Sequence, residues 1–255
     1  MADLLGLPTL ASEHGAKIDQ LIGIVHVLMF VLLVGWGAFF IYCLVRFRRK
    51  KNPKADRVGV TSHRSTYLEV SVAVIEIVLL VGFSIPFWMA EVDALPKPEE
   101  NPFEVRVIGQ QFAWYAHYPG PDGVFGPTSI DRVDDVENPV GLDKKASTGQ
   151  DDIVSTGILR LPVNRQALIH VSSKDVIHSF SVPEFRVKQD AIPGMRVPVQ
   201  FTPTMTTDEL RAQTGDKYRS FEIVCAQLCG LGHFRMKGTV MVLPEAEIAE
   251  WVQGQ

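Results

Sequence analysis

Two long apolar stretches constrain this chain more than any other feature. Residues 21–45 are apolar apart from one histidine and small residues, and residues 68–90 are apolar apart from Glu69, Glu76 and two serines. Each stretch exceeds the roughly 20 residues that a helix needs to cross about 30 Å of hydrocarbon. The first is too long for the core of a signal peptide, and it lacks a basic start and a small-residue cleavage site. The sequence therefore predicts a pair of membrane-spanning helices.

Basic residues gather between the two stretches and predict the orientation of this hairpin, residues 21–90. The loop 46–66 contains eight lysines and arginines. Because basic residues in short loops stay in the cytoplasm, the loop is expected there. The N-terminal arm, residues 1–20, and everything after the hairpin then lie on the other side. We expect a two-pass protein of the bacterial inner membrane with both termini in the periplasm.

The rest of the chain has the pattern of an all-β domain. A linker rich in proline and charge, residues 91–102, precedes the domain, residues 103–255. Short β-branched and aromatic runs predict strands at residues 103–108, 112–118, 157–161, 167–172, 179–182, 196–201, 221–224 and 239–243. Short strands at this spacing indicate a β-sandwich or barrel. A proline in the first turn favours a closing helix over residues 244–251.

Charge and cysteine content exclude two classes of protein. The formal net charge is -4, so no basic surface is available in bulk to bind nucleic acid. Three cysteines are too few for a multi-bridge disulfide scaffold. The acidic segment 131–152 belongs to a long excursion between strands, which we expect to be exposed. It is either a solvated face or a surface that steers a basic soluble partner.

The strongest chemical signal lies near the C-terminus, in residues 225–236. Cys225, Cys229, His233 and Met236 place two thiols, an imidazole and a thioether in a single expected loop. Soft sulfur ligands with imidazole select copper over magnesium or calcium, and a thioether is a common weak axial ligand of copper. The segment therefore predicts a copper site, and two thiolates indicate more than one ion.

His178 is the best candidate for a further imidazole ligand. The other histidines lie in a span, on the cytoplasmic side, or on expected strands without a ligand partner. Three other interpretations of the same residues stay open: a disulfide between Cys225 and Cys229, a structural zinc site with His178 and His233, or a single copper bound by one cysteine, two histidines and Met236.

At this point the chain resembles subunit II of haem-copper cytochrome c oxidases over nearly its whole length. The shared motifs are Asp-Val-Ile-His-Ser-Phe at 175–180, Lys-Gln-Asp-Ala-Ile-Pro-Gly at 188–194, and the 225–236 segment, all after the hairpin. The resemblance implies a two-helix transmembrane hairpin followed by an all-β, cupredoxin-like Greek-key barrel. It also implies that this barrel holds the dinuclear copper centre called CuA.

The resemblance further implies a role for each ligand. Cys225 and Cys229 would bridge two copper ions, His178 and His233 would each bind one ion, and Met236 and the backbone carbonyl of Gln227 would be weak axial ligands. Electrons would come from a cytochrome c and pass to haem in the catalytic subunit. That subunit would reduce oxygen to water, coupled to proton translocation, so no catalytic residue is expected in this chain.

At Gln227 and Phe112 this chain departs from the usual family residues. Gln227 replaces the glutamate that most often helps to bind magnesium at the subunit interface, and a neutral amide is a weaker ligand for a hard cation. The expectation of a magnesium site is weakened accordingly. Phe112 aligns with the tryptophan at which electrons usually enter, so Phe112 or Trp114 is expected to contact the donor; for Trp114 a place in the strand core is the alternative.

Glu69 aligns with the glutamate that stands at the mouth of a proton path in many relatives. A carboxylate within a span is costly and is read first as functional. The alternative for Glu69 is an interfacial residue that extends to water. Glu76 has no counterpart in the family, and pairing with a neighbouring subunit is one explanation for it.

The expected partners are the haem-bearing catalytic subunit I, other oxidase subunits, membrane lipid and a separate cytochrome c donor, because this chain has no C-x-x-C-H haem motif. Two other functions fit some of the same residues. A copper-containing nitric oxide reductase subunit would share the copper site and differ in its partner. A membrane-anchored copper carrier would need labile ligands and usually tracts rich in methionine or histidine, which this sequence lacks.

Overall fold

The computed structural model describes residues 4–54, 57–59, 61–92 and 95–254. The chain divides into a helical unit, residues 20–94, and a β unit that combines residues 95–255 with the N-terminal arm 1–19. Parts of three predicted segments lie outside the described residues: 1–3 of the arm, 55–56 and 60 of the basic loop, and 93–94 of the linker.

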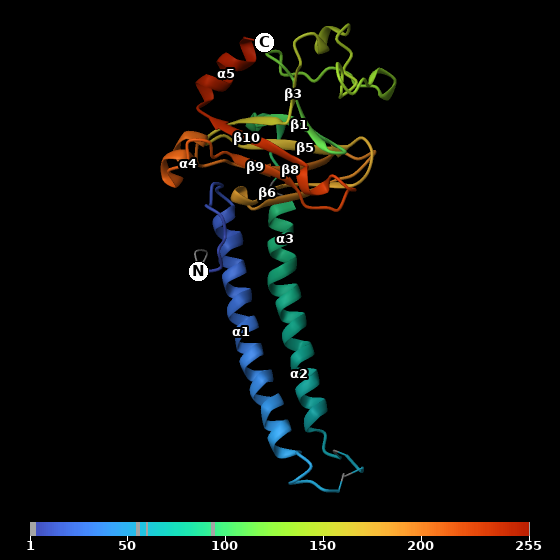
Figure 1. Cartoon of the computed structure of the whole chain (residues 1–255), viewed down its shortest axis with the longest axis vertical. Coiled ribbons are helices and arrows are strands. Elements are labelled where there is room, and N and C mark those ends of the chain that lie inside the picture. The colour runs from blue at the N-terminus through green and yellow to red at the C-terminus, as the bar shows by residue number, and fades with distance from the viewer. Residues whose placement is uncertain (1–3, 55–56, 60, 93–94, 255) are drawn as a thin grey trace. The chain divides into compact units, whose positions relative to one another are not determined.

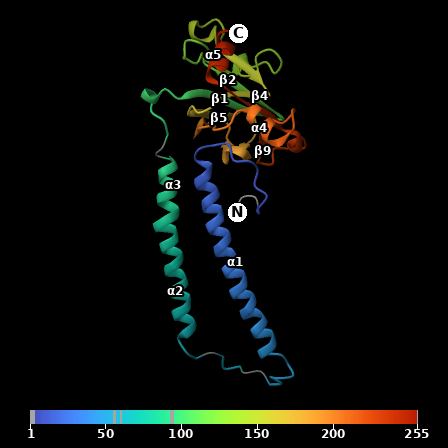
Figure 2. The same ribbon diagram turned by 90° about the vertical axis from the view of Figure 1, so that its left-hand side faces the viewer.

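The helical unit contains two long helices that run in opposite directions (Figures 1 and 2). The first is α1 (Gly15–Arg46), and the second joins α2 (Arg64–Leu79), the π-helical turn η1 (Leu80–Ser84) and α3 (Ile85–Val92). The π turn lies directly before Pro86, whose missing N–H interrupts regular helical bonding. Both helices are long and apolar enough to cross a membrane, and they expose apolar side chains along their length. The predicted pair of apolar helices is confirmed.

Ten strands of the described β unit form two five-stranded sheets (Figure 1). The first sheet has the order β3 (Ile153–Thr156), β2 (Ala113–Tyr118), β1 (Phe103–Gln110), β5 (Ala167–Ser173) and β8 (Val197–Phe201). The second has the order β4 (Ile158–Pro162), β10 (Lys237–Leu243), β9 (Phe221–Cys225), β6 (His178–Val182) and β7 (Val187–Ala191). The β1–β5 and β4–β10 pairs are parallel, and the other pairs are antiparallel.

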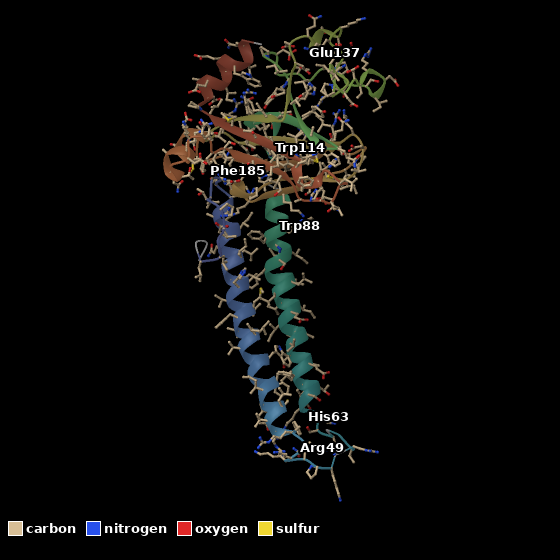
Figure 3. All side chains as sticks on the ribbon, viewed as in Figure 1. Arg49, His63, Trp88, Trp114, Glu137 and Phe185 are labelled. Atoms are coloured by element: carbon tan, nitrogen blue, oxygen red, sulfur yellow. The ribbon has the colours of Figure 1, made fainter. Side chains whose placement is uncertain are left out.

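Strand periodicity accounts for the core of the β unit. On β1, Val105, Val107 and Gly109 are buried, whereas the alternate residues are half-buried, as expected when successive side chains point to opposite faces. Large buried side chains from both sheets fill the core: Trp114, Leu161, Ile169, Phe180, Phe185 and Phe221. Trp114 and Phe185 are labelled within this unit in Figure 3. The predicted all-β domain after a helical hairpin is confirmed.

Three elements of the β unit were not predicted from the sequence. Strands β3 and β7 have too few apolar residues to stand out, and the helix α4 (Thr207–Thr214) has a strongly polar composition. A sequence signal for α4 was present: Thr206 and Glu209 form a capping box. The predicted closing helix is found as α5 (Glu245–Gln253). Short helical turns are found at Pro98–Glu100, Ile130–Arg132, Ser147–Gly149, Pro183–Phe185 and His233–Arg235.

The excursion between β2 and β3 is less exposed than the sequence suggested. It lies on the same side of the sheets as α5 (Figures 1 and 2). Val140 and Leu142 are buried against Tyr115. Asp152 is buried and bonds to His117, and Asp135 forms an ion pair with Lys174. Many residues of the excursion are exposed, as expected, and these contacts hold other parts of it against the sheet.

Arg186 anchors the N-terminal arm to the β unit. Its guanidinium donates to both carboxylate oxygens of Asp19, at 2.6 and 3.0 Å, and to the carbonyl of Pro8 at 2.8 Å. The Ser12 hydroxyl donates to the carbonyl of Phe185 at 2.7 Å. The side chains of Arg186 and Asp19 are only 6% and 15% exposed. The arm is therefore part of the folded unit rather than a free tail.

Replacing Arg186 is expected to destabilise this unit strongly. The change Arg186→Ala leaves the largely buried Asp19 carboxylate without its partner, which lowers the free energy of unfolding by about 3 kcal/mol. The control Arg211→Ala removes an exposed ion pair with Asp208 and lowers it by about 1 kcal/mol or less. Chemical denaturation of the purified chain in detergent, followed by tryptophan fluorescence, measures both. Equal losses in the two variants would contradict the anchoring role of Arg186.

Candidate metal centre

Strand pairing between β6 and β9 brings together two segments that are far apart in the sequence. Phe180 of β6 pairs with Cys225, the last residue of β9. His178 lies two residues before Phe180 and so is on the same face of β6. After Cys225 the chain forms a loop over residues 226–236 that returns to β10. The ends of two adjacent strands thus position a histidine beside a cysteine-containing loop.

The six predicted donor atoms lie in one cluster. Cys225 Sγ is 3.9 Å from His178 Nδ1 and 3.2 Å from the Gln227 carbonyl oxygen. Cys229 Sγ is 3.6 Å from His233 Nδ1 and 3.7 Å from Met236 Sδ. The two sulfur atoms are 3.8 Å apart. Donors about 2.2 Å from a shared ion at tetrahedral angles stand about 3.6 Å apart, so these spacings fit metal coordination.

The donors divide into two groups that meet at the sulfur pair. Cys225 has His178 and the Gln227 carbonyl beside it, and Cys229 has His233 and Met236. Each group offers an imidazole and one weak donor. The arrangement can hold two soft ions that share both sulfurs. The sulfur separation is far above the roughly 2.05 Å of a disulfide bond, and both thiols are free in the structure.

Asp175 fixes the orientation of the His178 ring. Its Oδ1 lies 2.8 Å from His178 Nε2, which leaves Nδ1 facing Cys225. The same carboxylate accepts hydrogen bonds from the backbone N–H groups of Gln111 at 2.8 Å and Val176 at 2.7 Å. Burial raises the pKa of Asp175, but these hydrogen bonds outweigh burial and hold the pKa below its usual range. Asp175 therefore carries a negative charge that selects the His178 tautomer suited to metal binding.

The turn between β1 and β2, residues 111–112, packs against the cysteine loop. The Gln111 side chain donates to the Cys229 carbonyl at 2.5 Å. The Phe112 ring lies so close to the loop that a Cβ on Gly232 would stand 2.4 Å from it, so only glycine fits there without a shift. The Arg235 guanidinium lies 5.7 Å from the Phe112 ring centre. Sequence reasoning did not find these supports, although the glycines at 230 and 232 were a signal of close backbone approach.

The electrostatics of the two thiols favour a bound cation. Burial and the adjacent Cys225 together raise the pKa of the Cys229 thiol to about 11. Two neighbouring thiolates repel each other unless a positive charge lies between them. Metal ions of the expected chemistry would supply that charge.

The remaining predicted residues lie at different depths. Trp114 is 1% exposed, and its ring packs edge-on at 6.0 Å from both His178 and Phe180. Phe112 is half-buried. The loop itself carries an apolar rim, Leu228, Leu231 and Phe234, of which Leu231 is 98% exposed. Glu69 lies on α2 in the helical unit, outside this cluster.

Comparison with known proteins gives the family. The profile described as "Cytochrome C oxidase subunit II, periplasmic domain" matches residues 103–242. The chain belongs to the cytochrome c oxidase subunit II family. The alternative cytochrome c oxidase subunit 2 of Bradyrhizobium diazoefficiens is 32% identical over 219 residues, which cover 85% of this chain and 72% of that protein. Cytochrome c oxidase subunit 2 of Cereibacter sphaeroides is 27% identical over 264 residues, which cover 97% of this chain and 79% of that protein.

Among solved structures, the periplasmic domain of subunit II of cytochrome oxidase (CoxB) of Bradyrhizobium japonicum is 27% identical, with a TM-score of 0.40, over 60% of this chain and 91% of that one. The family assignment confirms the resemblance, the cupredoxin-like fold and membership of a haem-copper oxidase. With its two apolar helices, the chain is a membrane-anchored subunit of such an oxidase, and its family carries the copper centre CuA.

Removing the charge of Asp175 is expected to loosen this subunit II site even without metal. In Asp175→Asn the backbone N–H groups and His178 lose a charged acceptor, which lowers the free energy of unfolding by about 2 kcal/mol. A matched control is Asp190→Asn, on the neighbouring β7, whose carboxylate forms no hydrogen bond or ion pair in the part of the chain that the structure describes. Chemical denaturation of the metal-free chain compares them. A loss in Asp190→Asn as large as that in Asp175→Asn would refute this role.

Proposed function

We propose that this chain is the electron-accepting subunit of its oxidase, taking single electrons from a cytochrome c at a dinuclear copper centre and passing them to haem in the catalytic subunit I. The observation that carries the proposal is the convergence of two imidazoles, a thioether and a backbone carbonyl around one pair of thiol sulfur atoms. When bound, copper supplies one-electron redox chemistry. The chain itself supplies the ligands, their fixed geometry and the surface on which a donor docks.

In this proposal Cys225 and Cys229 would hold two copper ions between them, with His178 and His233 as the imidazole ligands. The Met236 thioether, 3.7 Å from Cys229 Sγ, and the Gln227 carbonyl, 3.2 Å from Cys225 Sγ, would be weaker ligands. Electron transfer is fast when ligand positions change little between oxidation states. Two strand ends, the Asp175 bonds and the Gln111–Phe112 turn hold the ligands in place, which favours small changes.

The donor set favours copper over the other interpretations of the motif. Structural zinc takes four ligands in a tetrahedron, usually thiolate and imidazole, and this would leave the Met236 thioether and the Gln227 carbonyl unused. One copper ion would leave one cysteine unused. Magnesium is not proposed here, because it takes oxygen ligands and the exposed Gln227 side chain offers a neutral amide where a carboxylate would bind better.

We further propose that electrons enter beside Phe112. Its ring packs on the copper loop and is half-exposed, next to the apolar rim of Leu228, Leu231 and Phe234. A partially exposed aromatic ring with apolar neighbours suits a transient contact with the haem edge of a soluble cytochrome. Trp114 is buried behind His178, so its part is to hold the ligand ring rather than to contact the donor.

The orientation is proposed from the charge of the loop between the helices. Eight lysines and arginines in residues 46–66 favour a cytoplasmic loop, and the copper domain and both termini would then face the periplasm. This places the copper centre on the side where soluble cytochromes c act. It also puts Glu69, near the start of α2, close to the cytoplasmic face from which protons are taken up.

Copper loading of the full chain in detergent tests the proposed centre. We expect about two copper ions per chain and, in the oxidised form, an electron spin resonance spectrum with one unpaired electron split by two equivalent nuclei. Cys225→Ser and Cys229→Ser are each expected to abolish that spectrum, because either change removes a bridge. The matched control Cys43→Ser alters a cysteine of α1 outside the site and leaves the spectrum unchanged.

Other outcomes of that titration exclude the centre. One copper with a four-line spectrum supports a single-copper cupredoxin. Zinc retained in preference to copper supports a structural site. Either result would exclude the dinuclear copper centre and, with it, the proposed electron-accepting role.

Glu69 is proposed to stand at the mouth of a proton path into the catalytic subunit. In the assembled oxidase, Glu69→Gln is expected to slow turnover several-fold, because the amide cannot relay a proton. The control Glu76→Gln lies two turns further along the same helix and is expected to keep turnover near that of the unchanged oxidase. Oxygen consumption and proton uptake by oxidase in vesicles are measured together. Equal effects of the two changes would remove Glu69 from the path.

A further inference from the structure

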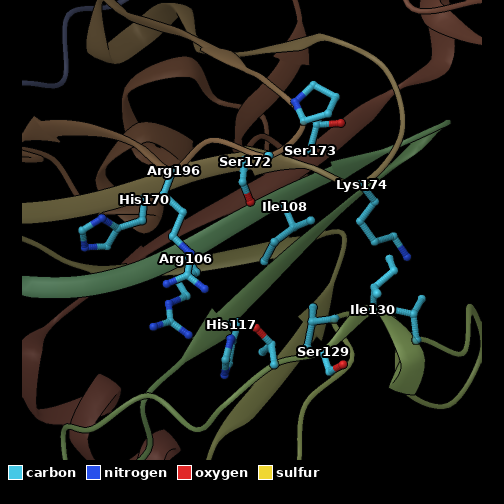
Figure 4. Close-up of a pocket in the computed structure, with 15 residues that line it drawn as sticks. Arg106, Ile108, His117, Ser129, Ile130, His170, Ser172, Ser173, Lys174 and Arg196 are labelled. Atoms are coloured by element: carbon cyan, nitrogen blue, oxygen red, sulfur yellow. The ribbon is translucent and has the colours of Figure 1, made fainter.

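A cavity separate from the metal centre lies on the outer face of the first sheet, away from the core. It has a volume of about 290 Å³ and is bounded by β1, β2, β5, the start of β8 and the excursion 128–140. Five of the 15 residues that line it are basic (Figure 4): Arg106, His117, His170, Lys174 and Arg196. Nothing in the proposed electron transfer uses this cavity.

The strand register explains why these groups meet. Arg106 on β1 pairs with His117 on β2 and with His170 on β5, so three basic side chains form a row across the sheet. Arg196, just before β8, reaches the same place, and Figure 4 shows it beside Arg106, with the two histidines around them. Like charges close together on a sheet are destabilising. Both histidines of the row lie beside carboxylates, Asp152 and Glu104, so the charges that call for an anion are those of the two neighbouring arginines.

Three of these basic groups, Lys174, His117 and His170, already have carboxylate partners. His170 Nε2 lies 3.2 Å from Glu104 Oε2. Lys174 bonds to Asp135 at 3.2 Å and to the Pro139 carbonyl at 2.8 Å, which ties the excursion to the sheet. His117 Nε2 lies 2.5 Å from Asp152. His117 is fully buried, and its Nδ1 has no partner in the described structure.

The two arginines are not compensated in this way. Neither Arg106 nor Arg196 has a hydrogen-bond or ion-pair partner among the residues that the structure describes. The Arg106 guanidinium lies 3.9 Å from the centre of the Phe125 ring, which fixes its plane and leaves its N–H donors free. Burial and the neighbouring Arg196 together lower the pKa of Arg106 to about 10, although Asp152 and Glu104 raise it. An anion between the two guanidinium groups would offset their mutual repulsion.

We propose that this cavity binds a phosphate-class oxyanion between Arg106 and Arg196, with the Ser172 hydroxyl beside them as a further donor. Each guanidinium presents a fork of N–H groups that matches two oxygens of a carboxylate or phosphate. A carboxylate offers one such edge, whereas a tetrahedral phosphate offers several and can be held by two forks. The volume suits phosphate, pyrophosphate or a small phosphate monoester, and it is at the lower end of the roughly 300–1,000 Å³ of ligand pockets.

The full chain, purified in detergent in phosphate-free buffer, can be titrated calorimetrically with inorganic pyrophosphate. Saturable binding with one site per chain is expected. Arg106→Gln and Arg196→Gln should each weaken the affinity by about tenfold or more, because each change removes a charge-assisted, bidentate contact. The control Arg211→Gln removes the same charge from α4, outside the cavity, and is expected to keep the affinity within twofold. The copper spectrum of every variant should be unchanged, so failure of the copper proposal would not affect this result.

Two additional measurements make the outcome decisive. Pyrophosphate should raise the Tm of the unchanged chain and of Arg211→Gln, but not that of Arg106→Gln, which separates lost binding from lost folding. Native mass spectrometry of the chain extracted in mild detergent distinguishes the sources: a retained phospholipid that is lost in Arg196→Gln identifies a lipid headgroup, and its absence together with pyrophosphate binding identifies a soluble phosphate. Equal pyrophosphate affinities in all four proteins would overturn the proposal. So would loss of a neighbouring subunit in Arg196→Gln without any pyrophosphate binding, because Arg196 would then pair with a protein carboxylate.

Discussion

The hydrogen bond between Asp175 and His178 is the interaction on which the metal centre depends. A buried imidazole can present either nitrogen, and only the bond from Nε2 to a carboxylate makes Nδ1 the nitrogen that faces Cys225. The carboxylate can act in this way because backbone N–H groups of Gln111 and Val176 keep it charged and in place. The first of these comes from a different turn of the domain. The orientation of one ligand is thus set by two segments of the chain, residues 175–178 and the β1–β2 turn, rather than by the ligand motif alone.

The same Gln111 turn also supports the other half of the centre. Its side chain bonds to the Cys229 carbonyl, and Phe112 fills the space that the glycines of the loop leave open. Neither contact binds a metal. Together they make the cysteine loop dependent on the β1–β2 turn, so a change in that turn would alter both ligand groups at once. Because both ligand groups of the metal centre rest on this turn, a displacement of the turn is expected to move both groups.

Sequence alone could predict the helical pair, the all-β domain and the six donors, because each has a local signal: an apolar run, short alternating strands, or sulfur and imidazole at close spacing. It could not predict Asp175 as the partner of His178, since an aspartate three residues before a histidine is common without a contact. Arg106, His117 and His170 were equally hidden. His117 and His170 follow Arg106 by 11 and 64 positions in the sequence. Only the strand register of β1 with β2 and β5 brings the three residues into line. The contacts that position the sites are therefore long-range, and the groups that perform chemistry are local.

Strand β1 and the segment after β5 link the two sites of the domain. On β1, Gly109 faces inward so closely that a Cβ there would stand 2.9 Å from the His178 ring, while Arg106 and Ile108 face the basic cavity. After β5, Ser173 and Lys174 line the cavity and the next residue, Asp175, holds His178. The Ser173 hydroxyl itself lies 3.3 Å from Asp175 Oδ1, so a residue of the cavity wall contacts the carboxylate that orients the His178 ring. Because interiors are close-packed, the cavity and the metal centre depend on the same short segment, residues 173–175.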